Sequence, residues 1–203
     1  MSALLIGTRN PGKLSEIKTI LSELPHELIS LADFDRIETP AEEQSTYSGN
    51  AIIKARSYAA QTGVTALADD SGLEVAALGG APGILSARYA GEGASDAARR
   101  ALLISEIARR GIDASEARFV CAVAIARPDG MIINVAEAFC SGRIAQTERG
   151  ANGFGYDPLF VPDGYDLTFA ELDEAVKNRI SHRGKALTQT RDFLLRQPLT
   201  SAP

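Results

Sequence analysis

Two apolar segments around a tight turn place the strongest constraint on the fold of this chain. Residues 117–126 and 131–140 are rich in Ala, Val, Ile and Phe, and Arg-Pro-Asp-Gly at 127–130 separates them. Pro, Asp and Gly favour reverse turns, so we predict a β-hairpin here. Because a hairpin requires antiparallel pairing, the sheet that contains it is not purely parallel.

Before the hairpin, short strands alternate with amphipathic helices. Residues 3–7 indicate a buried strand, followed by Asn10, which can cap a helix, and Pro11, which suits its first turn. A second helix is predicted over residues 46–61, with Gly63 placed to end it. This alternation favours a sheet with helices packed against it.

The rest of the chain continues this pattern. An apolar strand at residues 66–68 is predicted to end at the Asp-Asp-Ser-Gly sequence of 69–72, and a third helix runs over residues 95–111. Residues 168–171 fit a capping box at the start of a short helix, and a last helix runs over residues 181–196. We therefore expect an α/β fold with a mixed, partly antiparallel sheet flanked by helices.

Length and charge limit the partners of the chain. Its 203 residues are expected to form one domain, 1–203, and 26 acidic against 21 basic side chains give a net charge of −5. No surplus of positive charge is available to bind a nucleic acid backbone.

The longest apolar stretch, residues 119–126, is far shorter than the ~20 residues of a membrane helix. With no export signal, we expect a cytoplasmic protein whose Cys121 and Cys140 are reduced thiols.

The first candidate site is the loop between the first strand and the first helix. A helix N-terminus presents unpaired N–H groups and a partial positive charge, a setting that favours phosphate. Lys13 adds a full positive charge, and Thr8 and Asn10 add hydrogen-bonding groups. The residues of this 8–13 loop are Thr8, Arg9, Asn10, Pro11, Gly12 and Lys13. An ordinary capped turn between strand and helix is the alternative interpretation.

Adjacent carboxylates form the second candidate site. Asp69 and Asp70 follow an apolar segment, and burying two acids is costly unless they are hydrogen-bonded, bound to metal or exposed to water. Mg²⁺ prefers such hard oxygen ligands and usually takes one or two protein carboxylates plus substrate phosphate oxygens. Glu42 or Glu43 is in a position to bring a further carboxylate to the same ion. A turn whose acids are solvated is the alternative.

An aromatic, glycine-rich segment at residues 152–158 is the third candidate. Gly153 and Gly155 allow the backbone to approach a flat ligand closely, and Phe154 or Tyr156 offers a stacking surface. Asp157 can accept hydrogen bonds from a base N–H. The alternative is an aromatic loop that fills the core.

Basic side chains near the last helix form the fourth candidate. Lys177, His182 and Arg183 are hydrogen-bond donors, and the guanidinium of Arg183 suits carbonyl or phosphate groups. A solvated basic helix start is the alternative. Together, the four candidates supply the parts of a nucleoside triphosphate site.

Six motifs connect the chain to a known family. In chain order they are Thr-Arg-Asn-Pro-Gly-Lys at 8–13, Ala-Asp-Asp-Ser-Gly-Leu at 68–73, Gly-Gly-Ala-Pro-Gly-Ile at 79–84, Ser-Ala-Arg-Tyr at 86–89, Gly-Phe-Gly-Tyr-Asp-Pro at 153–158 and Ser-His-Arg-Gly at 181–184. As a set they closely resemble the Ham1/RdgB family of dITP/XTP (inosine triphosphate) pyrophosphatases.

This resemblance carries expectations about fold and activity. It implies the elongated Ham1 fold, with two lobes and a central cleft, and a Mg²⁺-dependent homodimer. It also implies hydrolysis of non-canonical purine nucleoside triphosphates (ITP, dITP and XTP) to the monophosphate and pyrophosphate, which cleanses the nucleotide pool.

Position by position, the resemblance also implies residue roles. Asp70 matches the proton acceptor and metal ligand, and Glu42 best matches the metal-binding glutamate, with Glu43 beside it. The positions that match substrate-binding residues are the whole 8–13 loop, Ser71, Phe154, Gly155, Tyr156, Asp157, Lys177, His182 and Arg183. The chain departs from the family pattern at Arg9, where Gly is usual, and at Gly49 and Val176, where Glu is common.

The expected reaction is in-line attack of water on the α-phosphorus. Asp70 would orient or deprotonate the water, Glu42 and Asp70 would hold Mg²⁺, and Lys13 would stabilise the leaving pyrophosphate. Asp69 remains a candidate for one of the two roles given to Asp70. Two alternatives are a Maf-like pyrophosphatase of modified pyrimidine nucleotides and a nucleotide-binding module without catalytic activity.

Overall fold

The computed structural model describes residues 2–112, 114–197 and 199. The chain forms two compact units, and each is built from separated segments. Unit 1 comprises residues 1–70, 121–138 and 183–203, and unit 2 comprises residues 71–120 and 139–182. None of the described helices is both long enough and apolar enough to cross a membrane.

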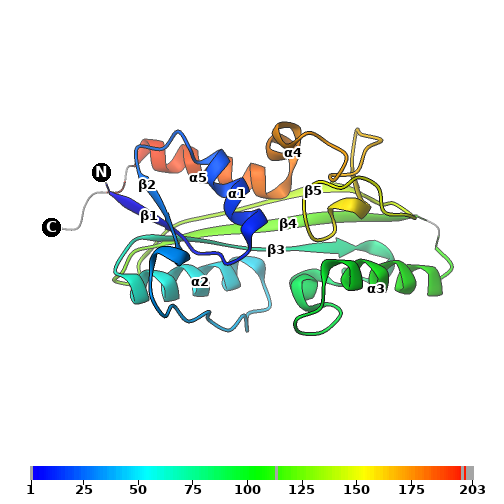
Figure 1. The fold of residues 1–203 in the computed structure, drawn as a ribbon, viewed down its shortest axis with the longest axis horizontal. Coiled ribbons are helices and arrows are strands. Elements are labelled where there is room, and N and C mark those ends of the chain that lie inside the picture. The colour runs from blue at the N-terminus through cyan, green and yellow to red at the C-terminus, as the bar shows by residue number, and fades with distance from the viewer. Residues whose placement is uncertain (1, 113, 198, 200–203) are drawn as a thin grey trace. The chain divides into compact units, whose positions relative to one another are not determined.

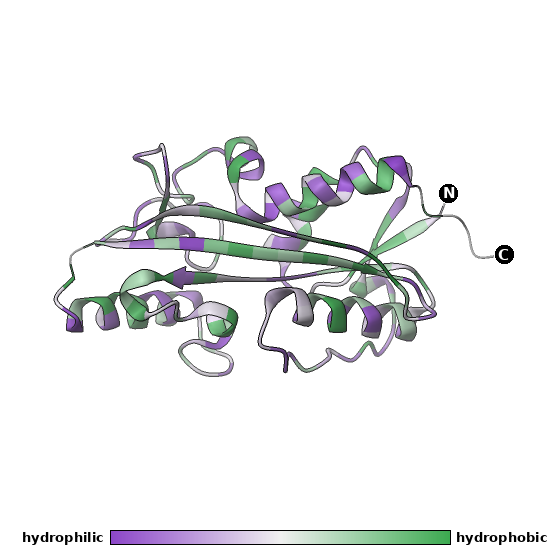
Figure 2. Cartoon of the chain, turned by 180° about the vertical axis from the view of Figure 1, so that it is seen from behind, coloured by the Kyte–Doolittle hydropathy of each residue, from purple (hydrophilic) through white to green (hydrophobic). Residues whose placement is uncertain are grey.

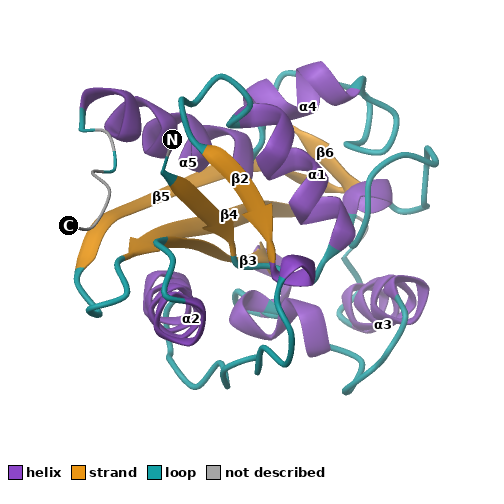
Figure 3. Cartoon of the chain, turned by 60° about the vertical axis from the view of Figure 1, so that its left-hand side comes forward, coloured by secondary structure: helices purple, strands orange, loops and turns teal. Residues whose placement is uncertain are grey.

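The strands form one six-stranded sheet in the order β2-β1-β3-β4-β5-β6 (Figure 3). Strand β1 pairs in parallel with β2 and β3, whereas β5 pairs antiparallel with β6, so the predicted mixed sheet is confirmed. The strands are β1 (Ala3–Ile6), β2 (Glu27–Ser30), β3 (Ala66–Val75), β4 (Ser115–Ala126), β5 (Ile132–Ile144) and β6 (Phe160–Pro162).

The turn between β4 and β5 confirms the predicted hairpin. These strands are neighbours in the sheet, and the backbone N–H of Gly130 donates to the carbonyl of Arg127. The N–H of Arg127 in turn donates to the carbonyl of Met131, which closes the loop.

Unit 1 contains helices α1 (Pro11–Ile20), α2 (Tyr47–Thr62) and α5 (His182–Arg196), the last beginning at the final residue of unit 2. In Figure 1, α1 and α5 lie on one face of the sheet and α2 lies on the other. As predicted, Asn10 caps α1 through its side-chain oxygen and Gly63 ends α2, where it adopts the left-handed conformation. Thr46 caps α2 through its side-chain oxygen.

The core of unit 1 fills the space between its helices and strands. Leu4 and Ile6 of β1, Ile17 of α1 and Leu187 of α5 are fully buried in one hydrophobic cluster. Hydrophobic and hydrophilic residues alternate along α5 (Figure 2), as expected for a helix with one side packed on a core.

Unit 2 contains helices α3 (Asp96–Arg109) and α4 (Glu174–Ile180) and a second core rich in aromatic rings. The Phe119 ring lies 4.8 Å from that of Phe160 and 6.0 Å from that of Phe169. The 3-10 helices of the chain are Leu31–Asp33, Ala76–Leu78, Gly83–Arg88 and Asp157–Leu159.

Strand β3 differs from its prediction. It does not end at Asp69 but runs on to Val75, so Asp69 and Asp70 lie inside a strand and not in a solvated turn. Buried cations compensate both acids, as described below. Further along, Gly72 lets the chain pass close to Gly83, because a Cβ at Gly72 would lie 2.2 Å from the Gly83 carbonyl oxygen.

Only half of the predicted capping box at residues 168–171 forms, and the predicted helix does not start there. The Thr168 N–H donates to Glu171 Oε2 at 2.8 Å, but the Glu171 N–H donates to the Thr168 carbonyl and the Thr168 hydroxyl donates to the Arg149 carbonyl. The segment is a turn, and α4 begins only at Glu174, after Asp173 as its N-cap. The sequence reasoning also missed β2, β6 and α4 as separate elements, all of them short.

Candidate active site

Strand β3 directs two adjacent carboxylates to opposite faces of the sheet, because side chains alternate along a strand. Asp69 contacts residues of α1 and α5, and Asp70 contacts residues of α2. Three cations contact Asp69 or Asp70, and two of these cations also contact a glutamate. Together these residues of unit 1 are named here the charged cluster: Lys13, Glu16, Glu42, Lys54, Asp69, Asp70 and Arg183.

On one face of β3, Asp69 is shared by two cations. Its Oδ2 lies 2.9 Å from Lys13 Nζ and 3.3 Å from Arg183 Nε, and Arg183 also donates to Glu16 Oε2. Burial alone would raise the pKa of Asp69, but Lys13, Arg183 and Lys54 together hold it well below its usual range. Asp69 is therefore ionised and fixes the position of Lys13.

The 8–13 loop has the geometry predicted for a capped helix start. Asn10 Oδ1 accepts from the Lys13 N–H at 3.1 Å, and Thr8 Oγ1 accepts from the Asn10 N–H at 3.2 Å. Arg9 turns away and donates from Nε to Thr39 Oγ1 at 3.1 Å and from its guanidinium to the Ile37 carbonyl. The Arg9 side chain thus ties the loop to the segment before α2.

On the other face of β3, Asp70 contacts an ammonium and an amide of α2. Lys54 Nζ lies 3.0 Å from Asp70 Oδ1 and 2.7 Å from Glu42 Oε1. Asn50 Nδ2 donates to Asp70 Oδ2 at 3.1 Å, while Asn50 Oδ1 accepts from the Gln44 N–H at 3.0 Å. Asn50 therefore connects Asp70 to the segment that carries Glu42.

The two acids of β3 have opposite pKa shifts. Burial raises the pKa of Asp70, Lys54 lowers it and Glu42 raises it again, so the pKa lies above its usual range. Burial would lower the pKa of Lys54, but Asp70, Asp69 and Glu42 raise it above its usual range. Asp70 is thus the acid suited to accept a proton, and Asp69 the one suited to a permanent charge.

The donor set around Asp70 fits a magnesium ion. Glu42 and Asp70 both contact one ammonium, so their oxygens are within reach of a single cation. Among the described residues there is no group of three or more His, Cys, Asp or Glu side chains arranged to hold a metal. A two-carboxylate site nevertheless suits Mg²⁺ when phosphate oxygens and water complete the coordination. Of the two neighbouring glutamates, Glu42 is the one that shares a cation with Asp70.

In unit 2, Asp157 organises the aromatic loop of residues 152–158. Its Oδ2 accepts from Lys177 Nζ at 2.6 Å and from the Phe154 N–H at 2.8 Å. Lys177 Nζ lies 5.0 Å from the centre of the Phe154 ring, within range of a cation–π interaction. Lys177 is buried on α4, so its interpretation as part of a solvated helix start is wrong.

The two aromatic residues of this loop have different environments. Tyr156 is buried, and its hydroxyl donates to the Ser86 carbonyl at 3.0 Å. Burial is the main cause that raises the pKa of Tyr156. Phe154 is half-buried, so it is the ring of the loop that offers a stacking surface, while Tyr156 packs in the core.

The remaining predicted residues are Ser71, His182 and Gly155. Ser71 follows Asp70 on β3 and is partly exposed. His182 is buried in unit 2 and stacks on Phe119, with ring centres 4.6 Å apart and planes inclined by 8°. Gly155 is held in place on both sides, since its N–H donates to Asp96 Oδ2 and its carbonyl accepts from Arg100.

Sequence reasoning missed Glu16, Asn50 and Lys54. A signal for Lys54 exists, because it falls on the same helical face as Tyr47 and Tyr58, which are buried. A lysine on the apolar face of a helix indicates a buried anionic partner.

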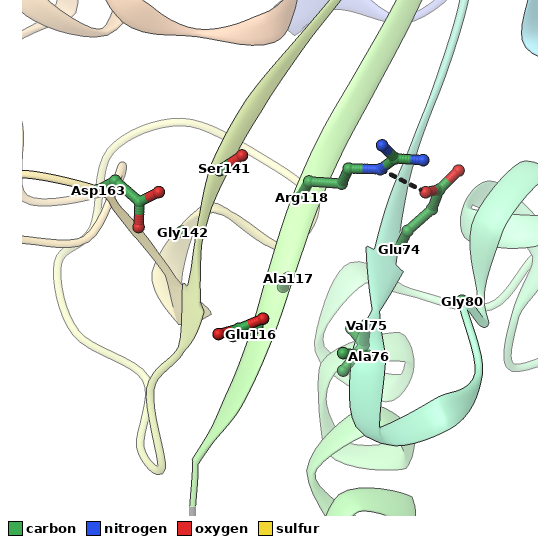
Figure 4. Close-up of a pocket in the computed structure, with 10 residues that line it drawn as sticks. All are labelled: Glu74, Val75, Ala76, Gly80, Glu116, Ala117, Arg118, Ser141, Gly142 and Asp163. Carbon is green, nitrogen blue, oxygen red and sulfur yellow. Dashed lines mark hydrogen bonds and ion pairs between the residues drawn. The ribbon is translucent and has the colours of Figure 1, made fainter.

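A separate cavity in unit 2 contains none of the predicted site residues. It has a volume of about 450 Å³, and Figure 4 shows Arg118 pointing toward Glu74, with 2.7 Å between Nε and Oε2. Its polar lining residues come from β3, β4, β5 and the turn after β6, and they include Glu116, Ser141 and Asp163.

Comparison with known proteins decides the family. The sequence profile of the Ham1 family matches residues 4–193. The chain belongs to the Ham1 family. It is 47% identical over 193 residues to a dITP/XTP pyrophosphatase of Desulforamulus reducens, an alignment that covers 95% of this chain and 96% of that protein. A dITP/XTP pyrophosphatase of Exiguobacterium sibiricum is 46% identical over 184 residues, covering 91% of this chain and 92% of that protein.

Solved structures of Ham1 proteins give the same result for the fold. A HAM1 protein from Coxiella burnetii superposes with a TM-score of 0.87 at 40% identity, covering 97% of this chain and 100% of that one. The Ham1 protein of Staphylococcus aureus superposes with a TM-score of 0.83 at 37% identity, with the same coverage. The resemblance of the six motifs and the predicted α/β fold class are therefore confirmed.

Two of the three departures from the family pattern, Arg9 and Gly49, have local explanations, and nothing in the structure explains Val176. Arg9 bonds to the segment at residues 37–39, as described above. At Gly49 a Cβ would lie 2.8 Å from Gln44 Cβ and 2.9 Å from Thr46 Oγ1. The space that a larger residue would need at position 49 is thus taken by Gln44 and the capping threonine.

Proposed function

We propose that this chain hydrolyses non-canonical purine nucleoside triphosphates (dITP, XTP and ITP) to the nucleoside monophosphate and pyrophosphate. The observation that carries the proposal is the pair Glu42 and Asp70, which converge on one cation in a Ham1 chain. The adjacent residue of β3, Asp69, holds Lys13 of the 8–13 loop. Carboxylates repel a triphosphate unless a metal lies between them, so this arrangement favours a metal-dependent enzyme over a simple binding module.

We assign the triphosphate to the 8–13 loop and Mg²⁺ to Glu42 and Asp70. Lys13 and the N–H groups at the start of α1 supply positive charge and donors for phosphate oxygens. Bound Mg²⁺ would offset phosphate charge and polarise the α-phosphate. Ser71, next to Asp70, is assigned as a further substrate contact.

Asp70 acts as the proton acceptor in this proposal. The water oxygen forms a bond to the α-phosphorus, the bond from that phosphorus to the bridging oxygen breaks, and pyrophosphate leaves. The water proton goes to Asp70, the position that matches the proton acceptor of the family. Lys13 stabilises the negative charge on pyrophosphate. Asp69 positions Lys13 and takes neither of the roles given to Asp70.

We assign the base to the aromatic loop and its basic neighbours in unit 2. The Phe154 ring supplies the stacking surface, with Gly155, Tyr156 and Asp157 as the loop that shapes it. Hypoxanthine and xanthine carry a 6-keto acceptor where adenine carries a 6-amino donor. A donor beside the base would be left unpaired against adenine, and sites of this kind discriminate by ~10⁴ or more.

Arg183 or a backbone N–H of the aromatic loop is the donor that we assign to the 6-keto oxygen. Lys177 and His182 belong to the proposed nucleotide-binding set, and Lys177 holds the loop through Asp157. Arg183 also belongs to the proposed nucleotide-binding set. Its bonds to Asp69 and Glu16 point to a role in ordering Lys13.

The proposal extends to a homodimer located in the cytoplasm. Light scattering coupled to size-exclusion chromatography tests the dimer. The chain has a mass of 21.5 kDa, so a dimer should give a measured mass of twice that value. A monomer at micromolar concentration would contradict this part alone.

Pyrophosphate release tests the function directly. The purified chain is incubated with ITP, XTP, dITP, GTP, ATP and UTP, each with and without Mg²⁺. We expect release from the first three, dependent on the metal. Preferential hydrolysis of UTP would favour a Maf-like activity, and binding without hydrolysis would favour a binding module. Equal turnover of ATP and ITP would refute the argument on base selection.

A further inference from the structure

Lys54 places a positive charge inside the proposed metal-binding site. It is buried on α2, and its ammonium bridges Glu42 and Asp70, at 2.7 Å and 3.0 Å. These are the two carboxylates to which the proposed function assigns Mg²⁺. A single positive charge therefore already lies between the oxygens that would hold a doubly charged ion.

We propose that Lys54 is a resident counter-ion that competes with the divalent cation for Glu42 and Asp70. The metal then binds weakly by itself and binds tightly only together with a triphosphate, which offers the ammonium other anionic partners. This inference rests on the proposed function in its choice of metal ligands.

The geometry around Asp70 allows such an exchange without disturbing the strand. Asn50 Nδ2 holds Asp70 Oδ2 at 3.1 Å, so Asp70 keeps its orientation when Oδ1 changes partner. Glu42 is 28% exposed at its side chain, so solvent and ions reach it. The four-carbon stem of a lysine is flexible, so the ammonium of Lys54 can leave by side-chain rotation alone.

The charge balance favours simultaneous entry of metal and nucleotide. In the charged cluster, the cations Lys13, Lys54 and Arg183 face four carboxylates: those of Glu16, Glu42, Asp69 and Asp70. A dication added alone would leave the cluster with an excess of positive charge. A triphosphate brought with the dication reverses that excess and attracts the ammonium.

Metal binding by the nucleotide-free chain tests the inference. The probe is Mn²⁺, followed by electron paramagnetic resonance, with Mg²⁺ as competitor. In Lys54→Met the ammonium is lost, and we expect Mn²⁺ to bind at least about tenfold more tightly than in the wild type. Lys18→Met is the matched control, since Lys18 is an exposed residue of α1 in the same unit, and its Mn²⁺ affinity should stay within about twofold of the wild type. Equal or weaker binding by Lys54→Met would overturn the inference.

A second variant keeps the test valid if Lys54→Met is unstable. Lys54→Gln retains a hydrogen-bond donor without the charge, and it should also bind Mn²⁺ more tightly than the wild type. The thermal midpoint gives an independent readout, because about 10 mM MgCl₂ should raise it more in either variant than in the wild type. A rise equal to or smaller than that of the wild type would contradict the competition.

Failure of the inference is distinguishable from failure of the proposed function. Adding Glu42→Gln to Lys54→Met should remove the gain in Mn²⁺ affinity, because it removes one of the two ligands. If the gain is present and the wild type releases no pyrophosphate from any nucleotide, the function falls and the counter-ion role stands. If the wild type is active and Lys54→Met shows no gain, the counter-ion role falls alone.

Discussion

Replacing Asp69 by Asn removes the carboxylate that Lys13 and the buried Arg183 share. Asp69 Oδ2 lies 2.9 Å from Lys13 Nζ and 3.3 Å from Arg183 Nε, and its side chain is 1% exposed. Removing one partner of a buried ion pair typically costs about 3–5 kcal/mol. Arg183 keeps Glu16 and Lys13 is 17% exposed, so we expect about 3 kcal/mol, the lower end of that range.

The thermal midpoint at neutral pH measures this loss. In a chain of this length, each kcal/mol lowers the midpoint by about 2–4 °C, so Asp69→Asn should melt about 6–12 °C below the wild type. Asp166→Asn is the control, because Asp166 is exposed and lies 3.8 Å from Arg143, and its midpoint should not change measurably. A midpoint for Asp69→Asn within about 2 °C of the wild type would refute the shared ion pair as a source of stability.

The difference in thermal midpoint between the wild type and Asp69→Asn should also depend on pH. The pKa of Asp69 is lower in the folded chain than in the unfolded chain, so its stabilisation is complete above the unfolded pKa of about 3.9. That stabilisation disappears as the pH falls through the folded pKa. The difference in midpoint between wild type and Asp69→Asn should therefore be constant from about pH 7 to pH 5 and shrink below about pH 4.

Three further substitutions separate catalytic from structural roles. Asp70→Asn should fold, as judged by circular dichroism, and should lose at least about 10²-fold in turnover of ITP, whereas near-normal turnover would remove Asp70 from the mechanism. Tyr156→Phe deletes the hydrogen bond to the Ser86 carbonyl and should lower the thermal midpoint by about 2–4 °C with turnover retained. A large loss of turnover would instead assign Tyr156 to the substrate. In Gly153→Ala the added Cβ would lie 2.1 Å from Asp157 Oδ2, at a residue whose φ is +74°. The loop would then shift, so the KM for XTP should rise by about tenfold while kcat changes less. An unchanged KM would contradict a role for the loop in binding.

Local signals in the sequence were sufficient to predict the elements that carry the 8–13 loop and α2. Asn10 and Thr46 cap their helices with their own side chains, and Gly63 ends α2, so each boundary is set by residues next to it. The hairpin of β4 and β5 was predictable for the same reason, because its turn residues are contiguous.

The extent of β3 was not predictable from local signals. Asp-Asp-Ser-Gly has the composition of a turn, and its true environment depends on Lys13 and Arg183, which are far away in the sequence. The bridging position of Lys54 is hidden for a similar reason, since its partners lie on other segments. Long-range ion pairs therefore decide the structure where composition alone favours solvent exposure.

The alternation of side chains along β3 makes two neighbouring, chemically identical acids non-interchangeable. Each is confined to its own side of the strand, and no rotation of a side chain carries a carboxylate from one side to the other. An enzyme that has lost one of them gains nothing from the presence of the other. Selection for revertants of either variant should accordingly restore a carboxylate at the substituted position itself, although the neighbouring position already carries one.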